Sequence, residues 1–154
     1  MIAMRERQLR SPYGESVHQR RKDMSPKTPR PAAAPGYTIQ RRSHCGKIFV
    51  TVTTQEGKPF EVFIRFGKAG GCGSAMADGI ARLVSYGLRS GLEAEDAVKA
   101  LSGIACHQGP RTCLNEVASA IRLILKHLET GADLNSMIEE EEFATANAME
   151  VVFP

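Results

Sequence analysis

Four cysteines carry the most reactive chemistry that this sequence offers. Cys45, Cys72, Cys106 and Cys113 are widely spaced and contain no Cys-x-x-Cys pair. Four thiolates brought to one place bind zinc tetrahedrally, whereas two neighbouring thiols can cycle between a dithiol and a disulfide. A single cysteine more often serves as a small buried hydrophobe. All three roles stay open until the elements that position the sulfurs are considered.

Two histidines extend the set of candidate ligands. His44 and His107 each stand next to a cysteine, so either imidazole can replace a sulfur at a zinc site. Cys72 and Cys113 are expected just before or within the first turn of a helix, where the helix dipole and free N–H groups stabilise a thiolate. A redox pair formed by these two thiols is therefore the main rival of a metal site.

Residues 36–66 are expected to form a small antiparallel sheet. Apolar and polar residues alternate over 47–53 and again over 60–66, which is the period of a half-buried strand. Residues 55–58, with the sequence Gln-Glu-Gly-Lys, supply turn residues, so the two strands form a β-hairpin. A shorter strand over 36–42 precedes the hairpin.

The register of this hairpin brings sulfurs to one end of the sheet. With a turn at residues 56–57, Lys47 lies opposite Phe66, and Cys45 falls at the same end of the sheet as Cys72. The other two cysteines stand seven residues apart across a Gly-Pro loop, so they can fold back together. Folding is therefore expected to gather all four thiols into one neighbourhood.

Three helices are expected to follow the strands. Ser74 is a suitable N-cap for a helix that stops at Gly91, residues 92–101 form a second, shorter helix, and Thr112 caps a third that ends at Gly131. Apolar residues recur at helical spacing in each. The expected buried positions are Met76, Ile80, Leu83, Val84 and Leu88 in the first helix, Val98 and Leu101 in the second, and Val117, Ala118, Ile121, Ile124, Leu125 and Leu128 in the third.

The order of these elements predicts an α+β fold. Strands come first and helices after, which is typical of an antiparallel hairpin or small sheet with three helices packed on one face. We expect one folded domain over residues 37–130. Residues 1–36, rich in Arg, Ser and Pro, have the composition of a disordered basic arm. Residues 131–154, with four consecutive glutamates, have that of a flexible acidic tail.

Charge is distributed unevenly along the chain. Residues 1–42 contain ten Lys and Arg against three Asp and Glu, whereas residues 129–154 contain seven acidic residues and no basic one. The arm suggests nucleic acid only weakly, because Tyr13 is the one aromatic residue among its arginines. No stretch approaches the roughly 20 apolar residues of a membrane span, and the first residues lack a secretory signal. A cytoplasmic protein without a membrane partner is expected.

A glycine-dense loop connects the sheet to the first helix. Residues 67–74 read Gly-Lys-Ala-Gly-Gly-Cys-Gly-Ser, and backbone N–H groups at such a turn favour anions. The pattern matches neither a Walker loop nor a dinucleotide fingerprint, and its glycines can equally serve close packing. The candidate ligand-binding residues for a nucleotide are Lys68, Gly70, Gly71, Ser74, Arg82 and Arg89.

A family resemblance covers the middle of the chain. Segments 46–52, 57–64, 67–70, 80–85, 87–91, 101–106 and 112–113 resemble, in unbroken order, motifs of the TSCPD domain. In that family the domain lies at the C-terminus of adenosylcobalamin-dependent ribonucleotide reductases, and it also occurs as small stand-alone proteins, some with four characteristic cysteines. The resemblance implies a shared site at the four cysteines, with zinc as its expected occupant.

The chain also departs from the family pattern. Where the family reads Thr-Ser-Cys-Pro-Asp, residues 111–115 read Arg-Thr-Cys-Leu-Asn, so any role of the Asp is in doubt, although Asn115 and Glu116 can support the helix start. The resemblance implies that a reductase also needs a large barrel with a radical cysteine, and these 154 residues are too few for one. Neither unaided ribonucleotide reduction nor adenosylcobalamin on this chain is expected.

These observations favour a stand-alone accessory or binding module related to ribonucleotide reductases, and hence to DNA synthesis, non-catalytic alone and stabilised by zinc. A protein that binds or sequesters a nucleotide through residues 67–74 is one alternative. A thiol redox partner that uses Cys72 and Cys113 is another. The expected partners are a reductase subunit, a nucleotide or a second copy of the chain.

Overall fold

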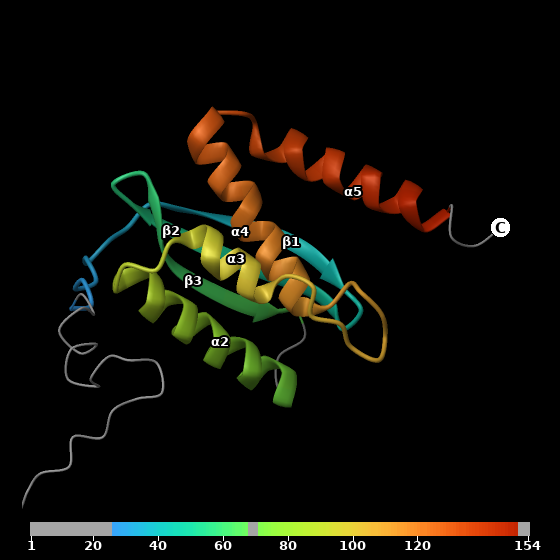
Figure 1. Cartoon of the computed structure of the whole chain (residues 1–154), viewed down its shortest axis with the longest axis horizontal. Helices are drawn as coiled ribbons and strands as arrows, with labels where there is room; N and C mark the ends of the chain where they lie inside the picture. The colour runs from blue at the N-terminus through green and yellow to red at the C-terminus, as the bar shows by residue number, and fades with distance from the viewer. Residues whose placement is uncertain (1–25, 68–70, 151–154) are drawn as a thin grey trace, which may run out of the picture.

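The computed structural model describes residues 26–67 and 71–150, with side chains to residue 147. It confirms the α+β class: an antiparallel sheet in the order β1-β2-β3 is followed by helices (Figure 1). The strands are β1 (Gly36–Ser43), β2 (Gly46–Gln55) and β3 (Lys58–Phe66). The helices are α2 (Cys72–Arg89), α3 (Ala94–Leu101), α4 (Cys113–Thr130) and α5 (Leu134–Glu150).

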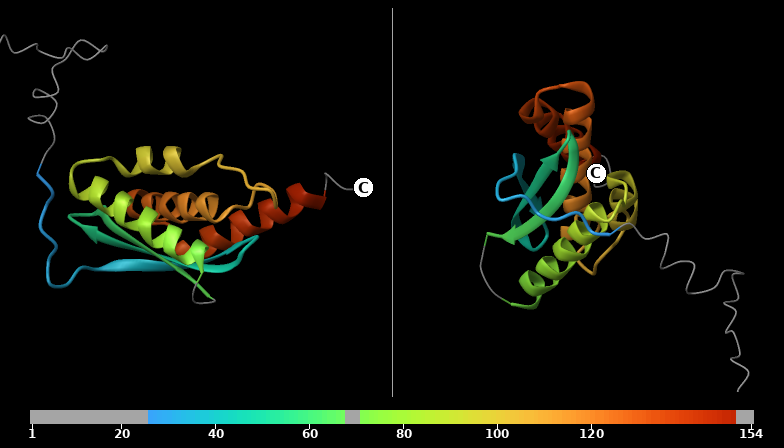
Figure 2. Two further views of the ribbon diagram at one scale, coloured as in Figure 1. Left: turned by 90° about the horizontal axis from the view of Figure 1, so that it is seen from below. Right: turned by 90° about the vertical axis from the view of Figure 1, so that its left-hand side faces the viewer.

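All four helices lie on the same side of the sheet, as the edge-on view in Figure 2 shows. α2 packs along β3, α4 crosses the three strands, and α3 packs on α4. The core between the layers is aliphatic, because the inward-facing strand residues are β-branched and the facing helix residues are small or branched. Its fully buried side chains include Ile39, Ile48, Val50, Val52, Val62, Val117, Ile121 and Ile124.

The hairpin turns at residues 56–57, as predicted, but its register at the far end differs by one residue. Ile48, rather than Lys47, pairs with Phe66. The reason is a β-bulge: the ladder passes from Pro59 to Glu61 and leaves Phe60 without a partner on β2. Alternation alone did not reveal this extra residue, because Phe60 is apolar and fits the inward pattern.

A hydroxyl on α2 satisfies the free edge of β3. The backbone N–H of Val62 donates to the Oγ of Ser85 at 2.9 Å, and the same hydroxyl donates back to the carbonyl of Val62 at 3.0 Å. Both residues are buried. Ser85 thus takes the place of a neighbouring strand and keeps the edge from pairing with another chain.

The start of α2 differs from the prediction. The helix begins at Cys72, and its N-cap is Gly71, whose φ of 86° favours glycine; no side chain caps this end. Ser74 therefore lies within the first turn and is not the N-cap.

The buried face of α2 also differs from the expected stripe. Met76 and Leu83 are 66% and 75% exposed, and the residues that face the sheet are Ala77, Ala81 and Ser85. The alanines bring the helix close to β3, so the larger apolar residues on either side of them are not needed for the contact. Of the expected stripe, Ile80, Val84 and Leu88 pack against the core from its margin.

The later helices largely agree with the prediction. Thr112 caps α4 by accepting a hydrogen bond from the N–H of Asn115, and Gly131 ends α4 in the left-handed region with a φ of 70°. The second helix is shorter than expected and begins at Ala94. The expected inward residues of α3 and α4 are buried or pack against the core.

The structure has a fourth helix, α5, in the segment that we expected to be a flexible tail. Its start is capped by Asp133, which accepts hydrogen bonds from the N–H and hydroxyl of Ser136, and these bonds lower the pKa of the Asp133 carboxyl. Met137 is buried, and Ile138 packs against the core. Consecutive glutamates hide this helical spacing, because Glu141 falls on the same inward face.

Residues 26–35 belong to the expected basic arm and run along the folded core as an extended segment. The N–H of Thr28 donates to the carbonyl of Arg89, and the N–H of Thr54 donates to the carbonyl of Pro35. Residues 1–25 of the arm lie outside the described residues. Among the described helices, none combines the length and apolar character that a membrane crossing requires.

Replacing Ser85 by Ala tests the edge contact. Ser85→Ala leaves the buried N–H and C=O of Val62 without partners, so we expect the free energy of unfolding to fall by about 1–3 kcal/mol. Ser102→Ala is the matched control: Ser102 is exposed, its hydroxyl bonds only to the carbonyl of Val98, and a change within about 0.5 kcal/mol is expected. Equal urea denaturation midpoints of the two variants would contradict the edge role.

Candidate functional site

Three of the four cysteines lie at one end of the sheet. Cys45 lies in the β1–β2 turn, Cys106 in the loop between α3 and α4, and Cys113 is the first residue of α4. Both Cys45 and Cys106 act electrostatically on Cys113, raising its pKa. In Figure 1 the β1–β2 turn and the loop before α4 share the same end of the molecule.

His44 fastens the β1–β2 turn to the loop before α4. Its backbone N–H donates to the carbonyl of Arg111, and the N–H of Arg111 donates to the Nε2 of His44, both at 3.1 Å. Nε2 is therefore an acceptor, and the neutral ring carries its proton on Nδ1. Because this nitrogen already holds the loop, His44 acts as a clamp beside Cys45 rather than as a free ligand through Nε2.

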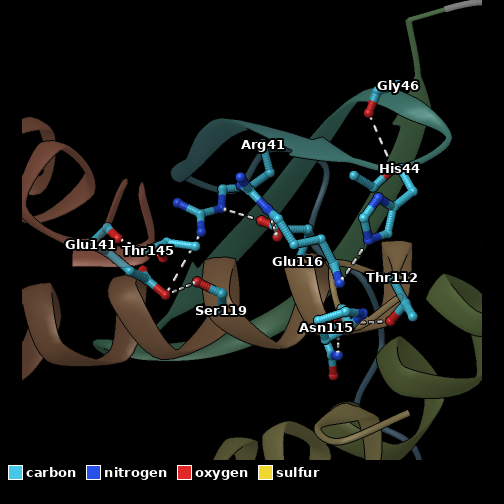
Figure 3. A network of polar contacts seen from close by, with 12 residues as sticks. Arg41, His44, Gly46, Thr112, Asn115, Glu116, Ser119, Glu141 and Thr145 are labelled. Carbon is cyan, nitrogen blue, oxygen red and sulfur yellow. Dashed lines mark hydrogen bonds and ion pairs between the residues drawn. The ribbon is translucent and has the colours of Figure 1, made fainter. Parts of the chain in front are cut away.

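A buried carboxylate links β1, α4 and the loop between α3 and α4. This loop, residues 102–112, contains Cys106 and is called the cysteine loop. Glu116, in the first turn of α4, accepts from the Nε of Arg41 at 2.9 Å and from the Nε of Arg111 at 3.3 Å. The side chain of Arg41 is only 3% exposed. Figure 3 shows the Arg41 guanidinium pointing at Glu116 from β1. An unpaired charge at this depth is very costly, so the pairing fixes β1, α4 and the cysteine loop relative to one another.

Arg41 also reaches α5. Its Nη2 lies 3.7 Å from a carboxylate oxygen of Glu141, which accepts a 2.6 Å hydrogen bond from Ser119 and a 2.9 Å bond from Arg122. The network in Figure 3 therefore runs from the cysteine end of the sheet to the last helix.

The cysteine loop is built around the side-chain amide of Asn115. Its Nδ2 donates to the carbonyls of Ile104 and Pro110, and its Oδ1 accepts from the N–H of Gly103 at 2.8 Å. Thr112 adds a 2.8 Å bond to the carbonyl of Ile104. Only a side chain with both N–H donors and an acceptor can make this set of bonds. This requirement explains the Asn at position 115.

Cys106 sits in a tight reverse turn within the loop. It pairs with Gly109 as an isolated antiparallel bridge, and its Sγ donates a weak hydrogen bond of 3.7 Å to the Gly109 carbonyl. The φ of Gly109 is 119°, and the His44 ring lies 3.1 Å from the position that a Cβ would occupy. The turn therefore needs glycine here and leaves the Cys106 sulfur exposed.

Burial raises the pKa of the Cys113 thiol, and the neighbouring Cys45 raises it further, while the N–H groups of Leu114 and of Cys113 itself lower it. The helix start does act in the expected direction. Desolvation outweighs it, because the Cys113 sulfur is half-buried whereas a reactive cysteine is normally accessible and electropositive. The pKa of Cys113 is therefore raised, contrary to the expectation of a stabilised thiolate.

Cys72 is exposed and forms the first residue of α2, directly after the segment whose residues 68–70 are not described. It does not contribute to the shift at Cys113, unlike the other two sulfurs. All four sulfurs are free thiols. Within residues 26–67 and 71–150, no three His, Cys, Asp or Glu side chains stand in an arrangement that could hold a metal ion. Cys45, Cys106 and Cys113 thus lie at one end of the sheet, but the described side chains do not form a metal site.

The candidate anion ligands lie elsewhere. Lys68 and Gly70 fall outside the described residues, and Gly71 and Ser74 lie at the start of α2. Arg82 is exposed and pairs with Asp78 at 2.8 Å. Arg89, at the far end of the same helix, pairs with the buried carboxylate of Glu61 at 3.1 Å and donates to the carbonyl of Thr28. The two arginines do not converge on the glycine loop.

Sequence reasoning placed Asn115 and Glu116 at the helix start but missed Arg41, the partner of Glu116. A signal was present: Arg41 occupies an inward-facing strand position two residues after Ile39 and opposite Ile48, and a charge there requires a buried partner. What the sequence cannot supply is the identity of that partner, because Glu116 lies 75 residues away.

Comparison with protein-family models identifies the family. The TSCPD domain model matches residues 20–125, well over half of the chain, so this chain belongs to the TSCPD domain family. The domain is linked to ribonucleotide reductases. Neither the curated proteins nor the solved structures give a match to the chain.

Replacing Asn115 by Asp tests the loop scaffold. A carboxylate cannot donate to the carbonyls of Ile104 and Pro110, so Asn115→Asp should lower the free energy of unfolding at pH 7 by about 1 kcal/mol or more. The loss should shrink as the pH falls, because a protonated carboxyl can donate once. Asn135→Asp, in the exposed first turn of α5, is the control and should be neutral or slightly stabilising. Equal losses at both positions in thermal unfolding would refute the scaffold role.

The pKa of Cys113 predicts its reactivity. In reduced, metal-free protein at pH 8, Cys113 should react with iodoacetamide more slowly than the exposed Cys45, Cys72 and Cys106, as peptide mass spectrometry can measure. Cys45→Ser removes a neighbouring charge and should speed the reaction. Its rate should keep rising above pH 9.0, the ordinary value.

The same shift sets a direction for stability. Because the folded pKa lies above the unfolded one, the contribution of Cys113 is fully present below pH 9.0 and is lost as the pH rises through the folded pKa. In the iodoacetamide experiment, alkylation of Cys113 as fast as that of the exposed Cys106 would contradict the raised pKa of Cys113.

Proposed function

We propose that this protein is an accessory or binding module related to ribonucleotide reductases, in which the cysteines hold a structural zinc ion. One observation carries the proposal: in a member of the TSCPD family, Cys45, Cys106 and Cys113 come to one end of the sheet from three separate elements. Thiolates are the ligands that a closed, structural zinc site prefers.

The donor set fits zinc in its chemistry. Cys45, Cys106 and Cys113 supply three sulfurs, and Cys72, which begins α2 beyond residues 68–70, is the fourth donor in this proposal. The His44 Nε2 is engaged with Arg111, which favours a set made of sulfur alone. Zinc bound by four thiolates leaves no open coordination position, so its chemistry is to cross-link the chain.

The residues of this chain determine what such a cross-link does. The β1–β2 turn and the cysteine loop lie at the surface and are held by hydrogen bonds from His44 and Asn115 and by the pairing of Arg111 with Glu116. A bond network through four sulfurs fixes these surface loops as one rigid surface. We propose that this end of the module contacts a reductase subunit in the cytoplasm, where thiols stay reduced.

The redox alternative has less support. In the metal-free protein, the raised pKa of Cys113 disfavours the thiolate that attacks in thiol exchange, whereas a bound zinc ion would itself stabilise that thiolate. Cys72, its expected partner, does not perturb it. The accessory role therefore does not depend on turnover at these sulfurs.

Metal analysis of the purified, reduced protein tests the proposal. We expect about one equivalent of zinc per chain and a fall in melting temperature when a chelator removes it, because a ligand that binds only the folded state stabilises it. Cys45→Ser, Cys106→Ser and Cys113→Ser should each lose most of the zinc. Less than a few tenths of an equivalent, with all four thiols freely reactive, would rule the site out.

A control variant checks the metal site, and a separate binding experiment tests the partner. Ser43→Ala alters the same turn without removing a sulfur, and it should keep its zinc. Retention of zinc by Cys72→Ser would show that another group supplies the fourth ligand. A TSCPD-family reductase from the same source, mixed with the zinc-loaded chain, should bind it more tightly than it binds the metal-free chain.

A further inference from the structure

The face of the sheet turned away from the helices carries a set of side chains that the thiol site does not use. The strand register arranges them in rows: Arg42 beside Lys47, then Gln40, Phe49 and Arg65, then Thr38, Thr51 and Phe63. The described helices pack on the opposite face (Figure 2). Apart from the two phenylalanines, every side chain in these rows is polar or positively charged.

The two aromatic rings are accessible and close to each other. Phe49 is 36% exposed and Phe63 is 41% exposed. Phe49 pairs with Arg65, two residues from Phe63 on the same side of β3, so the rings are diagonal neighbours with Cα atoms roughly 7–8 Å apart. Large apolar groups are costly to leave in water. Here the two rings are the apolar members of a face that is otherwise polar or positively charged.

The cationic surface continues around the edge of β3. A hollow of about 530 Å³ between β3 and α2 is lined by Lys27, Arg30, Arg65, Arg82 and Arg89 against the carboxylates of Glu61 and Asp78. Arg30 lies 5.7 Å from the centre of the Phe63 ring, and Lys27 lies 4.7 Å from that of Tyr86, which is 52% exposed. Arg30 and Phe63 therefore connect this hollow to the sheet face.

The carboxylates of this hollow do not cancel its charge. Glu61 is 3% exposed and is covered by both Arg30 and Arg89, and Asp78 is matched by Arg82. A larger hollow of about 740 Å³ at the hairpin turn has the opposite balance, with four glutamates against one lysine and one arginine. An anion is therefore favoured at the sheet face and its β3 edge, and not at the hairpin turn.

From this arrangement we infer that the open sheet face, Arg42, Lys47, Phe49, Phe63 and Arg65 with the adjoining Arg30, binds single-stranded nucleic acid. Unpaired bases stack on exposed aromatic rings of a sheet, while the surrounding Lys and Arg hold the phosphates. A duplex conceals its bases from such rings. The centre of a protein-binding interface is depleted of charge, whereas this face has cations in two of its three rows, the middle one included.

The chain contains no tryptophan, which makes a direct test of stacking available. Phe63→Trp should keep the stacking surface and place a single tryptophan on it, whose emission can be excited apart from that of the three tyrosines. Adding a 20-nucleotide oligo(dT) to the full chain should quench this fluorescence, because bases stack on the indole. Phe143→Trp is the matched control, since Phe143 is 70% exposed on α5, and it should not be quenched. Quenching of both variants alike, or of neither, would overturn the inference.

Affinity measurements then separate the face from the basic N-terminal arm. Binding of labelled oligo(dT) by anisotropy should weaken about fivefold or more in Phe49→Ala, where a stacking partner is lost. It should weaken at least about tenfold in the Lys47→Glu/Arg65→Glu double variant, and the dependence of log K on log salt should be shallower than in the parent. Lys99→Glu/Lys126→Glu makes the same charge change on exposed helix positions and should change affinity less than twofold.

Competitors identify the class of ligand. Excess unlabelled oligo(dT) should displace the probe, whereas equal phosphate concentrations of duplex DNA or of deoxynucleoside monophosphate should not. Displacement by the mononucleotide would replace the proposed partner by a free nucleotide and overturn the inference. Unchanged binding in Phe49→Ala and in the double variant, with both folded by circular dichroism, would assign all binding to the arm and overturn it as well.

Discussion

The buried carboxylate of Glu116 is the interaction on which the rest of this structure depends. It accepts from Arg41 of β1 and from Arg111 of the cysteine loop, and it stands three residues after Cys113 in α4. Removing one member of a buried ion pair strands the other charge and commonly costs about 3–5 kcal/mol. These charged contacts thus add to the apolar packing between β1 and α4 and tie the loop before α4 to both. That is why two exposed thiols and the half-buried Cys113 can share one neighbourhood.

A second buried carboxylate, Glu61, plays a comparable part at the opposite edge of the sheet. The bulge at Phe60 carries Glu61 to the β3 edge, where Arg30 and Arg89 neutralise it. Together with the hydroxyl of Ser85, this closes an edge that a three-stranded sheet would otherwise leave open. The same contacts hold residues 26–35 against the body. The molecule therefore separates its surfaces: sulfurs at one end, cations and aromatic rings on the open face, and the acidic helix α5 on the helical side.

Much of this could be predicted from periodicity and turn chemistry. The hairpin at residues 56–57, the Thr112 cap and the Gly131 stop depend on local residues, and they are confirmed. The bulge at Phe60 was missed because Phe60 is apolar and fits the inward pattern, and the exposure of Leu83 was missed because it depends on how closely α2 approaches β3. α5 was missed because four glutamates mask its inward residues. Local sequence patterns thus predicted most of the strands and helices, but not the details of how these elements pack.

The candidate site shows the same division. The helix start at Cys113 follows from the Thr112 cap, whereas the start of α2 at Cys72 has no side-chain cap and was not predicted. The raised pKa of Cys113 depends on burial and on Cys45, which are properties of the folded chain. The clamp formed by His44 and the ties of Glu116 link residues more than 60 positions apart. No spacing rule contains such pairs, although the inward position of Arg41 did indicate that one was needed.

Disulfide trapping in the folded, metal-free protein tests most directly whether the three elements are held together. Under mild oxidation, peptide mapping should find Cys113 joined within the same chain to Cys45 or Cys106, and this preference should be lost in Glu116→Leu. Trapping that involves mainly Cys72, or that is the same in the parent, in Glu116→Leu and in the chain unfolded by urea, would show that Glu116 does not gather the sulfurs.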